Sequence, residues 1–78
     1  MESPISLTEF KTQVLRYATN SLTVLTTVDN TFVAGFDGIQ VQYNTKLDVW
    51  TIFLPSGIIK SGADIEDAMY YAGIKEKH

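Results

Sequence analysis

The run Val49–Leu54 constrains the fold most, because it is apolar along almost its whole length and holds the only tryptophan. Its β-branched and aromatic residues predict a strand, and we expect it to be the central strand of a small sheet. Side chains of a strand alternate between two faces, so Trp50 and Ile52 share one face while Val49 and Phe53 share the other. Both faces are then apolar, and a sheet built around this strand needs cover on each side.

The cover for the second face has two sources that the sequence leaves open. Loops or the terminal arms of the same chain are one source. Another copy of the chain, or a partner protein, is the other. An apolar sheet face left in water would be a patch of the kind that marks interaction sites.

The length of 78 residues predicts one domain, residues 1–78, because the chain has no room for two cores. Nine acidic and six basic residues give a net charge of -3, which disfavours nucleic acid as a partner. The chain has no cysteine, no apolar run long enough to span a bilayer and no signal-peptide pattern in Met1–Pro4. We therefore expect a cytoplasmic protein with no membrane partner.

A helix is predicted from Ile5 to Asn20. Ser6 is placed as its N-cap, Glu9 three residues later completes a capping box, and apolar residues then recur at helical spacing. Asn20 and Ser21 favour an exit from the helix.

Strand propensity follows, with Leu22–Val28, Thr31–Phe36 and Ile39–Tyr43 separated by the turn dipeptides Asp29-Asn30 and Asp37-Gly38. In the third of these segments the apolar residues alternate with glutamines, which predicts one face in water. Together with Val49–Leu54 the segments form an antiparallel meander of four strands. The alternative has three strands, with Gly35 or Gly38 as a bulge in one long strand.

The second helix is predicted to begin at Gly62 or Ala63 and to end near Ala72. Ser61 is placed as its N-cap with Asp64 at the capping-box position, and Gly73 is placed to end it in the left-handed conformation. The assembled prediction is an α+β fold: an N-terminal helix, an antiparallel β-meander of three or four strands, and a C-terminal helix, with both helices on one sheet face.

The residue types needed for catalysis are scarce. The only histidine is His78, the last residue, and there is no cysteine, so we predict no enzyme, no metal site and no cofactor. Asp64 and Asp67 lie one helical turn apart, but the helix dipole explains acids in a first turn without a metal or a reaction.

Two further binding ideas are weaker. Gly57–Gly62 lies between a strand and a helix and could hold an anion with Lys60, although it lacks the glycine that precedes the lysine of a phosphate loop. Tyr43 and Trp50 could stack on the bases of a single strand, but only Lys46 would accompany them.

The strongest binding signal is the pair Tyr70-Tyr71, one helical turn beyond Glu66 and Asp67. Tyrosine offers a large contact area and is enriched in interfaces. The plainer interpretation is that both tyrosines rim the core. The residues predicted to bind a partner, on this helix or on the second sheet face, are Tyr70, Tyr71, Glu66, Asp67, Phe53 and Val49.

We therefore predict a small non-catalytic interaction module that docks on a larger protein and modulates or inhibits it. In size, acidity and order of elements the chain is similar to the short proteins with which phages and mobile elements block host enzymes. The alternative is a self-associating structural or regulatory subunit, a homodimer whose second sheet face is buried against another copy.

Overall fold

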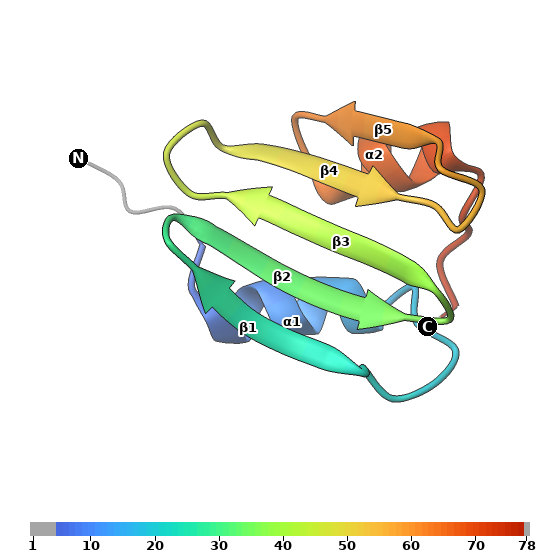
Figure 1. Ribbon diagram of the computed structural model, residues 1–78, viewed down its shortest axis with the longest axis horizontal. Coiled ribbons are helices and arrows are strands. Elements are labelled where there is room, and N and C mark those ends of the chain that lie inside the picture. The colour runs from blue at the N-terminus through green and yellow to red at the C-terminus, as the bar shows by residue number, and fades with distance from the viewer. Residues whose placement is uncertain (1–4, 78) are drawn as a thin grey trace.

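The computed structural model describes residues 5–77, so the expectations for Met1–Pro4 and His78 lie outside the described residues. Its elements in chain order are α1 (Leu7–Leu15), β1 (Val24–Val28), β2 (Thr31–Phe36), β3 (Ile39–Asn44), β4 (Val49–Phe53), β5 (Ile59–Gly62) and α2 (Ile65–Ala72) (Figure 1). An α+β fold with a helix, an antiparallel sheet and a second helix is confirmed.

The sheet has five strands in the order β1-β2-β3-β4-β5, and every neighbouring pair is antiparallel. The predicted count of three or four strands is wrong because the segment after Gly57, which carries no strand signal, forms β5. Gly57 adopts a φ of 94°, and the amide of Leu54 donates to the carbonyl of Ile58 at 2.9 Å, so the chain returns along β4. β4 is therefore an interior strand, but the central strand of the sheet is β3.

The turn between β2 and β3 decides between the two predicted meanders. Asp37 and Gly38 both have positive φ, 52° and 77°, which is the backbone of the tight hairpin turn that favours this dipeptide. Gly35 pairs with Val24 and Gln40 in regular register and forms no bulge on the β3 side. The interpretation with separate strands on each side of Asp37-Gly38 is confirmed.

The predicted N-cap is confirmed at α1 and is wrong at α2. Ser6 caps α1, since its hydroxyl accepts from the amide of Glu9 at 3.1 Å, but α1 ends at Leu15 rather than at Asn20. The prediction that Ser61 caps α2 is wrong. Ser61 lies in β5, and the N-cap is Asp64, whose Oδ1 accepts from the amide of Asp67 at 2.8 Å.

Gly62 explains how closely α2 follows β5. A Cβ atom added at Gly62 would lie 2.7 Å from the backbone nitrogen of Ala68 and 3.0 Å from Cβ of Asp67. Only a residue without a side chain allows the helix to sit directly against the end of this strand.

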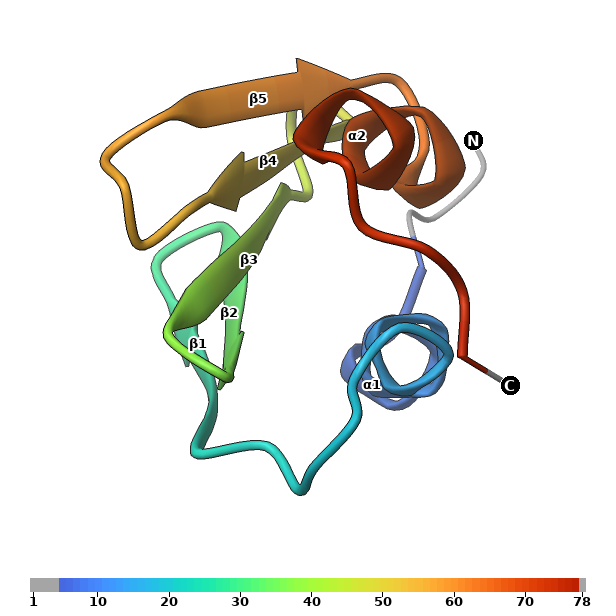
Figure 2. The same ribbon diagram turned by 90° about the vertical axis from the view of Figure 1, so that its right-hand side faces the viewer.

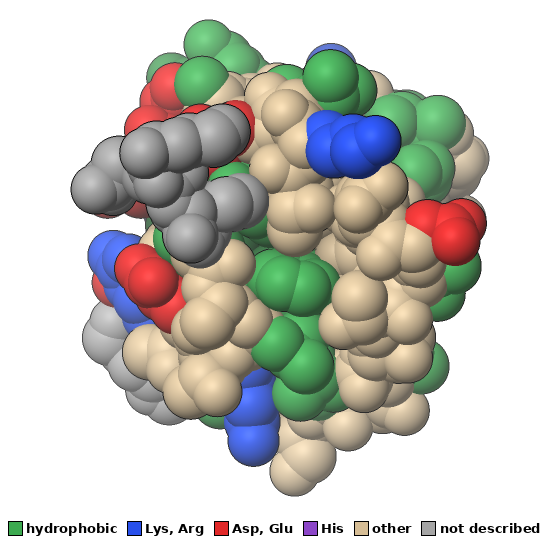
Figure 3. Space-filling view, turned by 90° about the vertical axis from the view of Figure 1, so that its left-hand side faces the viewer, with side chains coloured by type: hydrophobic (Ala, Val, Ile, Leu, Met, Phe, Trp, Pro, Cys, Tyr) green, Lys and Arg blue, Asp and Glu red, His purple; other side chains and the backbone are tan. Residues whose placement is uncertain are grey.

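The core combines side chains from both helices with one face of β2, β3 and β4. Figure 2 shows α1 and α2 on the same side of the curved sheet. The buried residues of the core include Phe10 and Val14 of α1, Ile65 and Met69 of α2, and residues of the strands. The buried strand residues are Ala34, Phe36, Val41, Tyr43, Trp50 and Ile52. Figure 3 views the molecule from the end that carries the β1–β2 and β3–β4 connections. On this end, hydrophobic side chains reach the surface in the middle, and charged side chains lie at the margins.

Aromatic rings join α1 to the sheet. The ring of Phe10 stacks on that of Trp50 with centroids 5.4 Å apart and planes at 15°, and it meets Phe32 at 5.5 Å. Tyr43 lies against Trp50 at 4.8 Å. The lone tryptophan is thus the centre of an aromatic cluster and not an exposed surface.

Tyr43 is buried, and its hydroxyl donates to Oδ1 of Asp48 at 2.5 Å. Burial, followed by this hydrogen bond and the charge of Asp48, raises the pKa of Tyr43 to about 12. A tyrosine in the unfolded chain ionises near pH 10, so between about pH 10 and pH 12 unfolding releases a proton. The contribution of Tyr43 to stability is therefore complete below about pH 10 and falls as the pH rises to about 12.

We expect the free energy of unfolding to drop by roughly 2 to 3 kcal/mol across this interval through Tyr43 alone. Urea unfolding of the wild type and of Tyr43→Phe at pH 8 and pH 11 measures about half of this drop, because pH 11 lies midway between the two pKa values. The phenylalanine variant should lose less stability between the two pH values than the wild type. Equal losses in both proteins would show that Tyr43 is not the group responsible.

Candidate functional site

The acidic and aromatic side chains of α2 share its exposed side. Ile65, Ala68 and Met69 are buried against the sheet, as their helical spacing predicts. The residues between them point away from the sheet, and residues three or four apart are neighbours on a helix. Glu66, Asp67, Tyr70 and Tyr71 are all exposed and are called the tyrosine surface below.

Tyr70 and Tyr71 are the main apolar component of this surface. They are 79% and 57% exposed, and their rings meet edge to face with centroids 5.8 Å apart. The structure therefore does not place them at the rim of the core with only their hydroxyl groups in water. Each presents most of a rigid ring to solvent.

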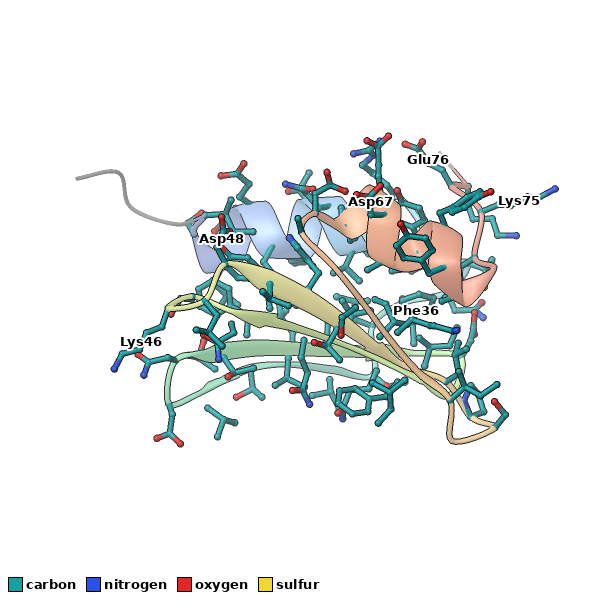
Figure 4. All side chains as sticks on the ribbon, turned by 90° about the horizontal axis from the view of Figure 1, so that it is seen from above. Phe36, Lys46, Asp48, Asp67, Lys75 and Glu76 are labelled. Atoms are coloured by element: carbon teal, nitrogen blue, oxygen red, sulfur yellow. The ribbon has the colours of Figure 1, made fainter. Side chains whose placement is uncertain are left out.

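A shallow hollow of about 420 Å³ borders the tyrosine surface. Its lining comes from α2, from the residues that follow α1 and from the segment after α2: Tyr17, Glu66, Asp67, Tyr70, Ile74, Lys75 and Glu76. Three of the predicted partner-binding residues therefore lie at one hollow. In Figure 4, Asp67 and Glu76 project on the side away from the sheet, and Lys75 extends past the end of α2.

The far wall of the hollow depends on the way α2 ends. Gly73 has a φ of 76°, and the amide of Ile74 donates to the carbonyl of Met69 at 2.9 Å, so the predicted left-handed ending is confirmed. The chain then turns back toward α1. There Nε of Arg16 pairs with Oε2 of Glu76 at 2.6 Å, and the amide of Lys77 donates to the carbonyl of Arg16 at 2.7 Å.

The charges around the hollow are mostly negative. Glu76 pairs with the guanidinium of Arg16 at 2.6 Å, and this hydrogen bond raises the pKa of Arg16. Burial raises the pKa of Tyr17, with the charge of Arg16 opposing it, and the phenol stays neutral. Glu66 and Asp67 face solvent, with no ion pair found for either within the described residues.

Val49 and Phe53, the other two predicted partner-binding residues, are half-buried and lie on the opposite face of the sheet from Trp50 and Ile52. The structure does not bring them together with the tyrosine surface. Register places on their face, called the open face below, residues from every strand: Val24, Thr26, Val28, Thr31, Val33, Gly35, Gln40, Gln42, Asn44, Val49, Thr51, Phe53, Ile59 and Ser61.

No residue of the open face is charged. Its apolar side chains belong to the strands on either side of β3. The polar side chains of β3, which the sequence predicts to face water, lie between them. There Nε2 of Gln42 donates to Oε1 of Gln40 at 2.8 Å. A face without charges whose polar groups bond to one another costs less to bury than a charged one.

Two of the weaker binding ideas fail in the structure. Tyr43 and Trp50 are 1% and 4% exposed, so they cannot stack on nucleic-acid bases. Residues 59–62 form β5 rather than the loop that enters α2, and Asp64 occupies the N-cap, so Lys60 has no free helix start beside it for an anion.

The hollow includes residues that sequence reasoning missed. Tyr17 and Glu76 line the hollow, and Glu76 holds Arg16 beside it, but the sequence pattern marks none of the three as a binding residue. Nothing in the spacing relates Arg16 to Glu76, which are 60 residues apart. The one usable signal was Gly73, because a left-handed residue reverses the chain toward the helix it has just left.

Within residues 5–77, no group of three or more histidine, cysteine, aspartate or glutamate side chains is placed to hold a metal ion. In the same range no helix has the length and apolarity to cross a membrane. Comparisons of the chain with protein-family models, with curated proteins and with solved structures found no match.

Proposed function

We propose that this protein is a non-catalytic interaction module that docks on a larger protein through the tyrosine surface and modulates or inhibits it. The exposure of Tyr70 and Tyr71 carries the proposal. Aromatic rings held in water on a rigid helix offer contact area at a small cost in conformational entropy, and tyrosine is over-represented among the residues that dominate binding energy.

The charges of the surface indicate the chemistry of the partner. Glu66 and Asp67 stand beside the rings, Arg16 just after α1 is paired with Glu76, and Lys75 is the one basic residue among the described residues that line the hollow. A lysine or arginine of the partner could lie over the ring of Tyr70 and reach these carboxylates. We therefore expect a basic patch on the partner.

The position of α2 supports a docking role. Its buried side packs in the core, and Gly62 seats it directly on β5, so the tyrosines project from a fixed helix and not from a loop. Binding then requires little ordering of the module. Blocking a larger protein, as phage proteins of this size do to host enzymes, requires such a surface and no catalytic group. A cytoplasmic location belongs to the same proposal.

The test begins with affinity capture on the immobilised protein and continues with titration of the captured partner. We expect Tyr70→Ala/Tyr71→Ala to weaken binding by about 30-fold or more, as the loss of a dominant contact does. Leu47→Ala is the matched control, because Leu47 is 71% exposed and lies in the connection between β3 and β4, far along the chain from α2.

Circular dichroism and thermal unfolding must first show that both variants fold as the wild type does. A folded double variant that binds the partner with unchanged affinity would rule out the tyrosine surface as the docking site. Phe53→Ser then tests the open face in the same titration.

A further inference from the structure

The two edges of the sheet are protected to very different degrees. β5 is short, carries Lys60 and lies against α2, and short charged or covered strands resist pairing with other chains. β1 has the sequence Val-Leu-Thr-Thr-Val, with no charge and no proline, and most of it is exposed. β1 is therefore the edge that would pair most readily with another strand.

Register identifies the backbone groups that β1 presents at this edge. Val28 and Thr31 flank a two-residue turn and bond to each other through their backbones. Hydrogen-bonded pairs alternate with non-hydrogen-bonded pairs along two antiparallel strands, so the backbone of Thr26 also bonds to β2. The N–H and C=O groups of Leu25 and Thr27 therefore point away from β2, toward the free edge.

We propose that this edge pairs antiparallel with β1 of a second copy, in a register centred on Thr26. Leu25 of each copy then exchanges backbone hydrogen bonds with Thr27 of the other. On the open face Val24 lies opposite Val28 of the second copy, and Thr26 lies opposite its own counterpart. Pairs of β-branched residues and of threonines are favourable across strands, so β1 is complementary to itself.

Charge and shape also fit a second copy. Each chain has a net charge of -3, yet the charged residues that the structure describes lie on the helices, in the connections, on β5 or in the segment after α2. Beside β1, on the helix side, a hollow of about 400 Å³ is lined by Lys11, Leu15, Ser21, Leu22 and Leu25. A copy paired at β1 would extend the sheet across this partly exposed leucine cluster.

Such a dimer is isologous, with its two-fold axis passing between the two Thr26 residues. The axis is perpendicular to the sheet, so the helices of both copies lie on the same side. One consequence of the dimer rests on the proposed function. If that function holds, the dimer presents two tyrosine surfaces together and binds a partner with two sites by avidity.

Sedimentation equilibrium over a dilution series reaching sub-micromolar protein tests the pairing, with no docking partner present. We expect the wild type to dimerise and Thr26→Lys to dissociate about fivefold or more readily, because identical charges then face each other at the axis. Thr26→Glu should act likewise. An equimolar mixture of the two variants should restore the dimer, since lysine then faces glutamate.

Gln40→Lys places the same charge on the open face, away from the edge, and should leave the dimer intact. Hydrogen exchange supplies a second readout, because the amides of Leu25 and Thr27 should be protected only in the dimer. A wild type that stays monomeric throughout the series would overturn the proposal. So would a dimer that survives Thr26→Lys but not Gln40→Lys, which would indicate packing between open faces.

Loss of partner binding by the tyrosine variants without a change in sedimentation would separate docking from self-association. A wild type that binds its partner as a monomer would support the proposed function while rejecting the pairing of β1.

Discussion

Replacing Phe10 by alanine is expected to remove a large part of the stability of the protein and to loosen α1 from the sheet. Phe10 is fully buried, and its ring is the one that ties α1 to Trp50 of β4 and to Phe32 of β2. Removing a buried phenylalanine ring costs about 3 to 5 kcal/mol. A chain of this size has a total stability of only about 4 to 12 kcal/mol.

Urea unfolding followed by near-ultraviolet circular dichroism measures this effect, because the aromatic signal reports the stack around Trp50. Leu47→Ala removes a comparable apolar side chain from an exposed position and should change stability by less than about 0.5 kcal/mol. A Phe10→Ala protein with the urea midpoint of the wild type would mean that α1 is held by other contacts.

A single methyl group at Gly62 is expected to cost about 1 to 3 kcal/mol, which is large for the change from glycine to alanine. The added Cβ would lie 2.7 Å from the backbone nitrogen of Ala68 and 3.2 Å from its Cα. A flexible side chain could rotate out of the way, but a helix backbone cannot. The cost arises because α2 must move away from β5.

Ser61→Ala is the matched control for Gly62→Ala, since Ser61 is the preceding residue of β5 and is exposed on the open face. Its replacement should leave the urea midpoint nearly unchanged. Because α2 carries the tyrosine surface, Gly62→Ala should also weaken partner binding. Equal stability of the two variants would contradict the close approach of α2 to β5.

The sequence predicts an element well where the signal is local. Asp37-Gly38 marks a hairpin because its turn needs residues that tolerate positive φ, and Gly73 marks the end of α2 for the same reason. Ser6 caps α1 through a hydrogen bond only three residues long. These predictions depend on the backbone preferences of one or two residues.

β5 escaped prediction because nothing local distinguishes it. Residues 59–62 include a lysine, a serine and a glycine, and they form a strand because β4 beside them has an unpaired edge. Pairing with β4 supplies backbone hydrogen bonds, and these stabilise a strand that residue propensity alone does not predict. The sequence predicts Ser61 as the helix cap for the same reason, but the cap is Asp64, three residues later.

The tyrosine surface was predictable in part. Helical spacing alone places Glu66 beside Tyr70 and Asp67 beside Tyr71. The opposite wall of the hollow, with Tyr17 and Glu76, comes from parts of the chain that only tertiary packing brings together. The exposure of the tyrosines follows from the packing of α2, which buries Ile65, Ala68 and Met69 on its other side.

The strict order of the sheet affects how the chain reaches this structure. Every strand pairs with its immediate predecessor or successor in the sequence, so each pairing closes only a short loop and loses little chain entropy. Within residues 5–77, distant parts of the chain are joined by the docking of the helices and by the bonds of Arg16 to Glu76 and to Lys77. The short sequence separation between paired strands favours rapid folding of the sheet.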